Sequence, residues 1–274
     1  MNRLESLTRV GPAPWSELAP GVQLQMLATG ELGAQGLTTA LANFQPGAAL
    51  TYHTHPCSEV VMVLDGYADI LVEGRRYRLS PLDALHIPAE TAHSTHNPAL
   101  ERSALLHTSF GAAAPTRDWV STEFREEIRA ASMPTDPEHL VRFAAASTYE
   151  LAVGTSFRDL FARRLGARGI CGGHGLFQPG AALPCHTHGF DESITIIAGV
   201  AVCQVAGQEY ELSGYGTACI PKGRPHRFLN RGAVPMAMIW VYAGAEPDRM
   251  LVPLGNCDGK RSFNDLTVRD MTSS

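Results

Sequence analysis

Hydrophobic residues in this chain occur in short runs, many of them β-branched or alternating with polar residues, and Gly, Pro, Asn and Asp separate the runs. The clearest runs cover residues 60–64, 67–72, 84–87, 194–197, 200–205, 217–220 and 236–242. Short strands divided by turn residues are typical of a β-sandwich or a β-barrel. The pattern therefore predicts an all-β protein.

The chain also repeats itself. The heptapeptide Phe-Gln-Pro-Gly-Ala-Ala-Leu occurs at residues 44–50 and again at 177–183, an offset of 133 residues. The same offset matches Gly33 with Gly166, Gly36 with Gly169, Gly66 with Gly199, Pro88 with Pro221, and Asn97 with Asn230. A register without gaps predicts an internal duplication, which runs from about residue 16 to 110 and again from about 149 to 243.

The duplication helps where local propensity is ambiguous. Residues 157–165 have helical propensity, but their partner segment, residues 24–32, contains an internal glycine and follows Pro20-Gly21. Because both copies should share one structure, we expect a strand in each.

Three regions follow from the repeat: an N-terminal barrel (1–112), a connector (113–146) and a C-terminal barrel with a tail (147–274). Residues 121–132 have an amphipathic helical pattern, and Asp136-Pro137 is typical of the start of a second helix. We therefore expect a short helical connector. The tail after Ala245 has no counterpart in the first half of the sequence.

Histidine and glutamate recur at matched positions in the two copies. The two sets are His53, His55, Glu59 and His93, and His186, His188, Glu192 and His226. Two histidines separated by one residue point to the same face of a strand, and turns can bring the glutamate and the third histidine from neighbouring strands. Three imidazoles and one carboxylate suit Fe(II), Mn(II), Ni(II) or Zn(II), with positions left open for water or substrate.

A single histidine in a strand is usually a hydrogen-bonded core residue, but eight residues in two identical spacings favour a metal site, because burying them without a metal would be costly. Both blocks of this pattern resemble the two-part motif of the cupin superfamily, and their tandem order resembles bicupins. The resemblance covers residues 16–110 and 149–243. It implies two jelly-roll barrels and one divalent transition metal per barrel, bound by the eight residues above.

Three positions depart from the motif. Leu82 and Tyr215 stand where a glycine is expected before the motif proline, and Glu90 replaces the glycine that the second copy keeps as Gly223. Glu90 leaves the conformation of the turn before His93 open, but the assignment of His93 as a ligand is kept.

The pocket linings differ between the copies. The shared register pairs Thr95 with Phe228, Cys57 with Phe190, and His107 with Trp240. We expect these residues to line or border the pockets, so that the second pocket is smaller and more aromatic and the first is roomier and more polar. For each of them ordinary packing is the competing interpretation. Strand alternation places Met62 and Thr195 on the outward faces.

Arg224 is the one candidate for binding an anionic substrate, because it lies in the turn before His226, although an arginine exposed in a turn is the simpler interpretation. Cys57 lies beside the ligands, where a redox role competes with that of an ordinary loop cysteine. No residue is identified as a dedicated catalytic base. Neither glutamate is followed two residues later by a tyrosine, since Val61 and Ile194 occupy those places.

Composition excludes several classes of protein. The formal net charge is −5, and the densest basic cluster, at residues 163–168, is typical of a solvated face, so no nucleic-acid partner is expected. No signal-peptide pattern or membrane-spanning run is present. The six cysteines form no C-x-x-C pair, and we expect free thiols and a cytoplasmic protein. Exposed sheet edges would allow a homo-oligomer.

These observations favour a metal-dependent bicupin enzyme acting on a small organic substrate. Our first hypothesis is an Fe(II) dioxygenase. The alternative is a Mn(II)- or Zn(II)-dependent decarboxylase, isomerase or hydrolase that consumes no dioxygen. A non-catalytic binder of small molecules ranks last, because no helix-turn-helix pattern accompanies the barrels.

Overall fold

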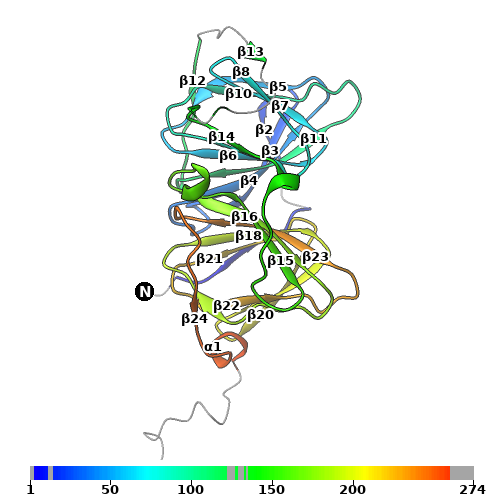
Figure 1. Cartoon of the computed structure of the whole chain (residues 1–274), viewed down its shortest axis with the longest axis vertical. Coiled ribbons are helices and arrows are strands. Elements are labelled where there is room, and N and C mark those ends of the chain that lie inside the picture. Colours follow the sequence, from blue (N-terminus) through cyan, green and yellow to red (C-terminus); the bar gives the residue numbers. More distant parts are fainter. Residues whose placement is uncertain (1–2, 12–14, 122–126, 129–132, 134, 260–274) are drawn as a thin grey trace, which may run out of the picture.

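The computed structural model describes residues 3–11, 15–121, 127–128, 133 and 135–259. In this part of the chain the fold is almost entirely β, as predicted, and the barrels formed by the two halves of the sequence are stacked along the long axis (Figure 1). No helix among the described residues is long and apolar enough to cross a bilayer.

Each half folds into two sheets. In the first half, one sheet has the spatial order β14 (His139–Val141), β9 (Ala84–Ile87), β6 (Glu59–Asp65), β11 (Ala104–Phe110), β4 (Thr38–Phe44), β3 (Val22–Ala28) and β2 (Ser16–Ala19). The facing sheet has the order β12 (Asp118–Trp119), β5 (Ala49–Thr54), β10 (His93–His96), β7 (Ala68–Val72), β8 (Arg75–Leu79) and β13 (Glu127–Ile128). The strands pair antiparallel, except that β13 runs parallel to β8.

The second half repeats this plan. One sheet has the order β1 (Ser6–Thr8), β21 (Thr217–Ile220), β18 (Glu192–Ala198), β23 (Met236–Tyr242), β16 (Cys171–Phe177) and β15 (Thr155–Phe161). The other has the order β20 (Gln208–Ser213), β19 (Val200–Val205), β22 (His226–Leu229), β17 (His186–Thr187) and β24 (Met250–Leu251). The strand expected over 24–32 and 157–165 forms in both copies but ends earlier, as β3 and β15. A 3-10 turn at Arg163–Leu165 follows β15.

Alternation along the strands builds three apolar layers. One face of each strand fills its own barrel, around Ile70 and Leu85 in the first and around Phe177 and Ile196 in the second. The opposite faces of β6 and β23 pack against each other, because Met62 and Val241 belong to one buried cluster between the barrels. Met62 thus faces outward as predicted, but the neighbouring barrel covers it. Burial on both faces explains why these strands are apolar at nearly every position.

The N-terminus crosses to the second barrel, as Figure 1 shows. Strand β1 pairs with β21, and Arg3 forms a bidentate ion pair with the buried carboxylate of Asp191, at 2.5 and 2.6 Å. Asp191 also accepts hydrogen bonds from the backbone N–H groups of Gln35 and Lys222. One buried carboxylate therefore ties the first barrel, the N-terminal strand and the second barrel together.

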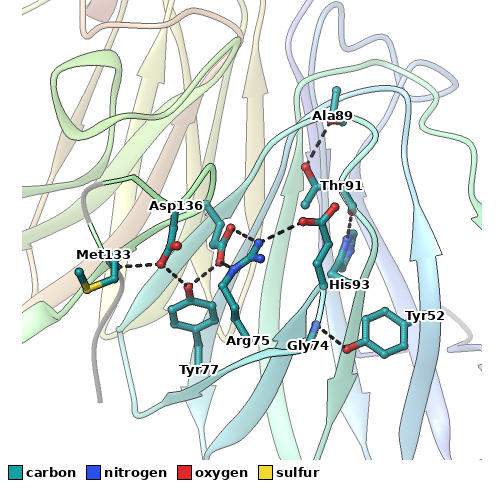
Figure 2. Close-up of polar contacts among 11 residues, drawn as sticks. Tyr52, Gly74, Arg75, Tyr77, Ala89, Thr91, His93, Met133 and Asp136 are labelled. Atoms are coloured by element: carbon teal, nitrogen blue, oxygen red, sulfur yellow. Dashed lines mark hydrogen bonds and ion pairs between the residues drawn. The ribbon is translucent and has the colours of Figure 1, made fainter. Parts of the chain in front are cut away.

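The connector differs from the prediction. Most of the first expected helix, residues 121–132, lies outside the described residues. The described part of this segment includes β13, which is a strand. The second expected helix, opening at Asp136, is absent: β14 follows and pairs with the edge strand β9. Figure 2 shows the reason, since the Tyr77 hydroxyl donates to Asp136, and the backbone N–H of Met133 donates to the same carboxylate. The Asp136 carboxylate therefore accepts hydrogen bonds within a turn and does not cap a helix.

The same cluster fixes the connector to the first barrel. Glu138 is fully buried, accepts a bidentate pair from Arg75 at 2.6 and 2.9 Å, and accepts a hydrogen bond from Tyr77. A 3-10 turn at Phe143–Ala145 then leads into the second half.

One expectation about the cysteines is wrong. Cys185 and Cys257 form a disulfide that ties β17 to the short C-terminal helix α1 (Gly255–Asp258). Cys57, Cys171, Cys203 and Cys219 are free. The expectation of a cytoplasmic protein relied on free thiols throughout and loses that support.

Candidate metal centres

The structure brings each predicted ligand set to one point inside its barrel. In the first barrel β5 carries His53, the turn after it carries His55, β6 begins with Glu59, and β10 begins with His93. Within each set the candidate ligand atoms all lie within 4.8 Å of one another, and all eight residues are buried. The register of β10 on β5 places His93 directly opposite His53, so strand pairing itself assembles the cluster.

Backbone carbonyls orient every imidazole of the first centre. The Nδ1 atom of His53 lies 2.7 Å from the carbonyl oxygen of Thr51, and that of His55 lies 2.5 Å from the carbonyl oxygen of Thr116. The Nδ1 atom of His93 lies 2.9 Å from the carbonyl oxygen of Thr91. Figure 2 draws this contact. A carbonyl can only accept, so each Nδ1 carries the proton and each Nε2 lone pair is left facing the centre.

The second centre repeats this arrangement. His186 Nδ1 lies 2.8 Å from the Pro184 carbonyl oxygen, and His226 Nδ1 lies 2.9 Å from the Arg224 carbonyl oxygen. The carbonyl of Asp248 accepts from His188 Nδ1. Such outer contacts are the usual means by which proteins fix the tautomer and orientation of metal-binding histidines.

The donor set fits a divalent cation. His93 Nε2 lies 2.8 Å from Oε2 of Glu59, although both atoms are acceptors once Nδ1 holds the proton. The buried Nε2 atoms of His55 and His188 have no hydrogen-bond partner. A buried cluster made only of acceptors requires a cation among them, and imidazole with carboxylate suits Mn(II), Fe(II), Ni(II) and Zn(II).

The electrostatics support the same conclusion. Burial lowers the pKa of His53 to about 3 and that of His186 to about 2, so both imidazoles are neutral. Burial alone would raise the pKa of Glu59, but its contacts with His55 and His93 hold it well below its usual value. The pKa of Glu192 is likewise lowered. Since each Nδ1 donates its proton to a carbonyl and each Nε2 faces the centre as a lone pair, three imidazoles and one carboxylate give each centre a single negative charge for the ion to offset.

The three departures from the motif do not alter the backbone. Leu82, Tyr215 and Glu90 have φ angles of 67°, 65° and 62°, in the left-handed region that glycine would occupy more easily. Gly223, the counterpart of Glu90, has a φ angle of 75°. The turn that delivers His93 is therefore the same turn that delivers His226.

A cavity of about 230 Å³ opens onto the first centre. His53, His55 and Glu59 form its polar end together with Thr95, Thr108 and Arg117. Its walls are mostly apolar, and they include Val22, Leu24, Phe44, Leu50 and Leu106. An open cavity at the first centre agrees with the expected difference between the two pockets, but its lining is more apolar than expected.

Aromatic rings occupy the corresponding space in the second barrel. Phe190 is stacked on His188 with centroids 5.8 Å apart, and Tyr242 lies 4.6 Å from the same imidazole. Phe228 and Trp240 are fully buried in the core of this barrel. Gly173 allows the indole to fit, since a Cβ there would lie 2.9 Å from Trp240 and 1.9 Å from the Arg158 carbonyl oxygen.

The pairing of His107 with Trp240 is wrong. Ala104 lies opposite Phe44, whereas Met236 lies opposite Phe177, so the last strand of the second copy starts one residue earlier. A shift of one residue exchanges the two faces of a strand. The counterpart of Trp240 is therefore Thr108, and His107 lies between the barrels, with Nε2 at 3.3 Å from the Thr195 hydroxyl.

The carbonyl of Arg224 orients His226, but its side chain pairs with the N-terminal segment. Its Nε donates to Glu5 at 2.5 Å, which ties the N-terminal strand to the turn before His226. Cys57 is half-buried beside the first centre, and burial raises the pKa of its thiol to about 11, so it stays protonated and is a poor nucleophile near neutral pH.

Sequence patterns did not point to the segments that support His55 and His188. Strand β12 pairs with β5, and strand β24 pairs with β17, at equivalent positions. We call residues 113–120 the first strap and residues 245–252 the second strap. Each strap supplies the carbonyl that orients its histidine, and because a backbone atom makes the contact, side-chain patterns do not reveal it.

Known proteins agree with this architecture. A cupin-domain family model matches residues 40–109 and 173–242, which together make up about half of the chain. The chain therefore belongs to the cupin family, with two cupin domains in tandem. No curated protein matches the sequence.

Solved structures of oxalate decarboxylase OxdC from Bacillus subtilis share the fold. A deletion mutant of that enzyme matches with a TM-score of 0.74 and 15% identity, over 90% of this chain and 79% of the other. The enzyme at pH 4.6 matches with a TM-score of 0.73 and 15% identity, over 90% and 78% of the two chains. A structure reported with an assignment of its Mn(II) centres matches at 0.74 and 16% identity, over 90% and 79%.

Proposed function

We propose that this chain is a Mn(II)-dependent bicupin enzyme that decarboxylates a small organic acid in its first barrel and consumes no dioxygen. One observation carries the proposal: the first centre opens onto a cavity of about 230 Å³, whereas Phe190, Phe228 and Tyr242 pack around the second. The described cavity at the first centre therefore provides space for a substrate, where aromatic rings stand in the second barrel. The cavity is small beside those that hold drug-sized ligands, which favours a metabolite-sized substrate.

The choice of metal and reaction is supported by two points. The ligand set of three imidazoles and a carboxylate suits Mn(II), and the OxdC structures that share the fold include one described by its Mn(II) centres. That enzyme is a decarboxylase by name. These points favour the decarboxylase over our first expectation of an Fe(II) dioxygenase.

His53, His55, Glu59 and His93 would hold the metal, which supplies Lewis-acid polarisation of a substrate oxygen. Thr116 and Thr108 keep these ligands in place, through a carbonyl on His55 and a hydroxyl on Glu59. The apolar walls exclude water, and a medium of low polarity disfavours a carboxylate relative to neutral carbon dioxide.

The reaction balances without an oxidant. The bond between the carboxylate carbon and its neighbour breaks, carbon dioxide leaves, and the electron pair moves into a carbonyl group attached to that neighbour, which gives an enolate. The neighbouring carbon then takes one proton from water. Only a carbonyl one carbon beyond the bond that breaks can accept the pair in this way, so we expect 3-oxo acids to be the reactive substrates.

The test uses the full-length protein loaded with Mn(II) and a panel of 2-oxo acids, 3-oxo acids and oxalate. Carbon dioxide release and dioxygen uptake are recorded in the same vessel. We expect carbon dioxide release without dioxygen uptake. Uptake in step with turnover would instead identify an oxygenase, and the absence of stoichiometric metal in the first barrel would remove the basis of the proposal.

A further inference from the structure

The two straps are structural counterparts, although the sequence register did not reveal them. Val120 N–H donates to the Tyr52 carbonyl, and Val252 N–H donates to the Cys185 carbonyl. At the other end, the carbonyl of Ala113 accepts from Gly30 N–H, and that of Ala245 accepts from Arg163 N–H. The same contacts at both ends extend the internal repeat to residues 113–120 and 245–252.

Each strap carries one arginine at the same place, and the two short sequences read Pro-Thr-Arg and Pro-Asp-Arg. The arginines are Arg117 and Arg249, one residue after the carbonyl that orients His55 or His188. In both, the buried Nε has no hydrogen-bond partner. A buried guanidinium donor without an acceptor is costly, which indicates a ligand or a functional requirement.

The surroundings of the two arginines differ. Arg249 donates from Nη2 to the Tyr242 hydroxyl at 3.1 Å, and its guanidinium lies 5.6 Å from the centre of the Phe157 ring. Arg117 lines the cavity of the first barrel and lies 5.8 Å from the centre of the exposed Trp119 ring. Within the described part of the chain no carboxylate forms an ion pair with Arg117.

Arg117 also stands close to the metal ligands. Burial lowers the pKa of its guanidinium, and the charge of Glu59 acts in the opposite direction. Arginine keeps its charge at any ordinary pH. One fixed positive charge therefore faces the same cavity as His53, His55 and Glu59.

We propose that Arg117 binds the substrate carboxylate and restricts the first barrel to monocarboxylates with an apolar body. A planar guanidinium recognises a carboxylate through paired charge-assisted hydrogen bonds. The apolar lining, which includes Val22, Leu24 and Phe44, offers no charged partner, so a second carboxylate against it would lose its hydration without compensation. This substrate class rests on the function proposed above and differs from oxalate, the substrate in the name of the structural relative.

Isothermal titration of the full-length protein as purified tests the inference, with metal content determined on the same preparation. The probes are hexanoate, hexanamide and oxalate, and the first two carry no oxo group and so report binding without turnover. We expect hexanoate to bind more tightly than both of the others. Arg117→Gln should weaken hexanoate binding about 10- to 100-fold, and Arg117→Lys should weaken it less, because it keeps the charge but not the paired geometry.

Arg249→Gln is the matched control, since it removes the equivalent arginine from the other strap, and hexanoate binding should not change. The melting temperature and metal content of Arg117→Gln should match those of the wild type. Unchanged hexanoate binding by Arg117→Gln, or equal binding of hexanamide, would overturn the inference. Failure of the proposed reaction is a separate outcome, because turnover or metal could be lacking while hexanoate binding still depends on Arg117.

Discussion

The hydroxyl of Thr108 donates a hydrogen bond of 2.6 Å to Oε1 of Glu59, inside the first barrel. The other carboxylate oxygen, Oε2, faces His93 and His55 at 2.8 and 3.3 Å. Glu59 is thus held in position on one side while it faces the metal ligands on the other. In the second barrel the counterpart of Thr108 is Trp240, whose ring cannot serve as this donor because its only polar hydrogen, on Nε1, is buried without a partner.

We predict that Thr108→Val weakens Mn(II) binding in the first barrel about 10- to 100-fold, the range typical when an outer partner of a metal ligand is removed. Valine keeps the shape of threonine but leaves Oε1 of Glu59 without its donor. Mn(II) titration followed by electron paramagnetic resonance measures the effect. Ser109→Ala is the control, since Ser109 is the next residue of β11 and faces His107 on the other side. Equal losses in both variants would contradict the assigned role of Thr108.

The strand pattern predicted the ligands but not everything around them. His53 and His55 were predicted from their spacing of two residues, and Glu59 from a short turn that leads onto the next strand. The face of His107 could not be predicted, because the loop after Asn230 is one residue shorter than the loop after Asn97 and no residue type marks the change.

The straps and the disulfide were not predicted, because neither leaves a local pattern in the sequence. The straps act through backbone carbonyls, which every residue carries, and Arg117 and Arg249 match only once the shorter loop is known. The disulfide joins Cys185 and Cys257, which are 72 residues apart, so no local spacing pointed to it. The prediction of a second connector helix was wrong because Asp136 binds the Tyr77 hydroxyl and the N–H of Met133, and these contacts depend on the folded barrel.

His55→Ala and His188→Ala separate the roles of the two centres. Each removes one ligand of one centre, so each should abolish the bound metal of its own barrel and leave that of the other. We predict that turnover falls at least about 100-fold in His55→Ala and stays within about threefold of the wild type in His188→Ala. Mass spectrometry of bound metal and carbon dioxide release measure the two effects. Loss of turnover in His188→Ala with full metal in the first barrel would count against a reaction confined to that barrel.

Thr95→Phe copies into the first barrel the residue that fills the second, Phe228. The ring should occupy the cavity and lower kcat/KM at least about tenfold, while the metal stays bound, because Thr95 is not a ligand. The reciprocal variant, Phe228→Thr, should destabilise the protein by about 3–5 kcal/mol, as expected when a large core side chain is truncated, without lowering turnover per folded protein. Steady-state kinetics and thermal unfolding test the pair. An unaltered kcat/KM in Thr95→Phe would show that the substrate does not enter this cavity.

The disulfide between Cys185 and Cys257 should stabilise the second barrel by about 2–4 kcal/mol, the usual range for a bridge that closes a long loop. Cys257→Ala should lower the melting temperature of the non-reduced protein accordingly. The wild type should lose stability when a reductant is added, and Cys257→Ala should not respond, which makes the variant its own control. A melting temperature of the wild type that is insensitive to reductant, under conditions that cleave the bridge, would contradict the prediction.

His107 gives the stability a pH dependence. Burial between the barrels lowers the pKa of its imidazole to about 4, from an ordinary value of about 6.5 in the unfolded chain. The unfolded state therefore binds more protons than the folded state between pH 6.5 and pH 4. The contribution of neutral His107 to the free energy of unfolding is fully present above pH 6.5. It is lost as the pH falls across that range, by about 3 kcal/mol in total. His107→Gln keeps a group that can bond to the Thr195 hydroxyl but cannot take up the proton. Denaturant unfolding at several pH values measures the slope of the free energy of unfolding against pH. In this variant the slope should be shallower, by the equivalent of up to one proton taken up on unfolding. An identical slope in the two proteins would mean that His107 does not stay neutral in the folded state.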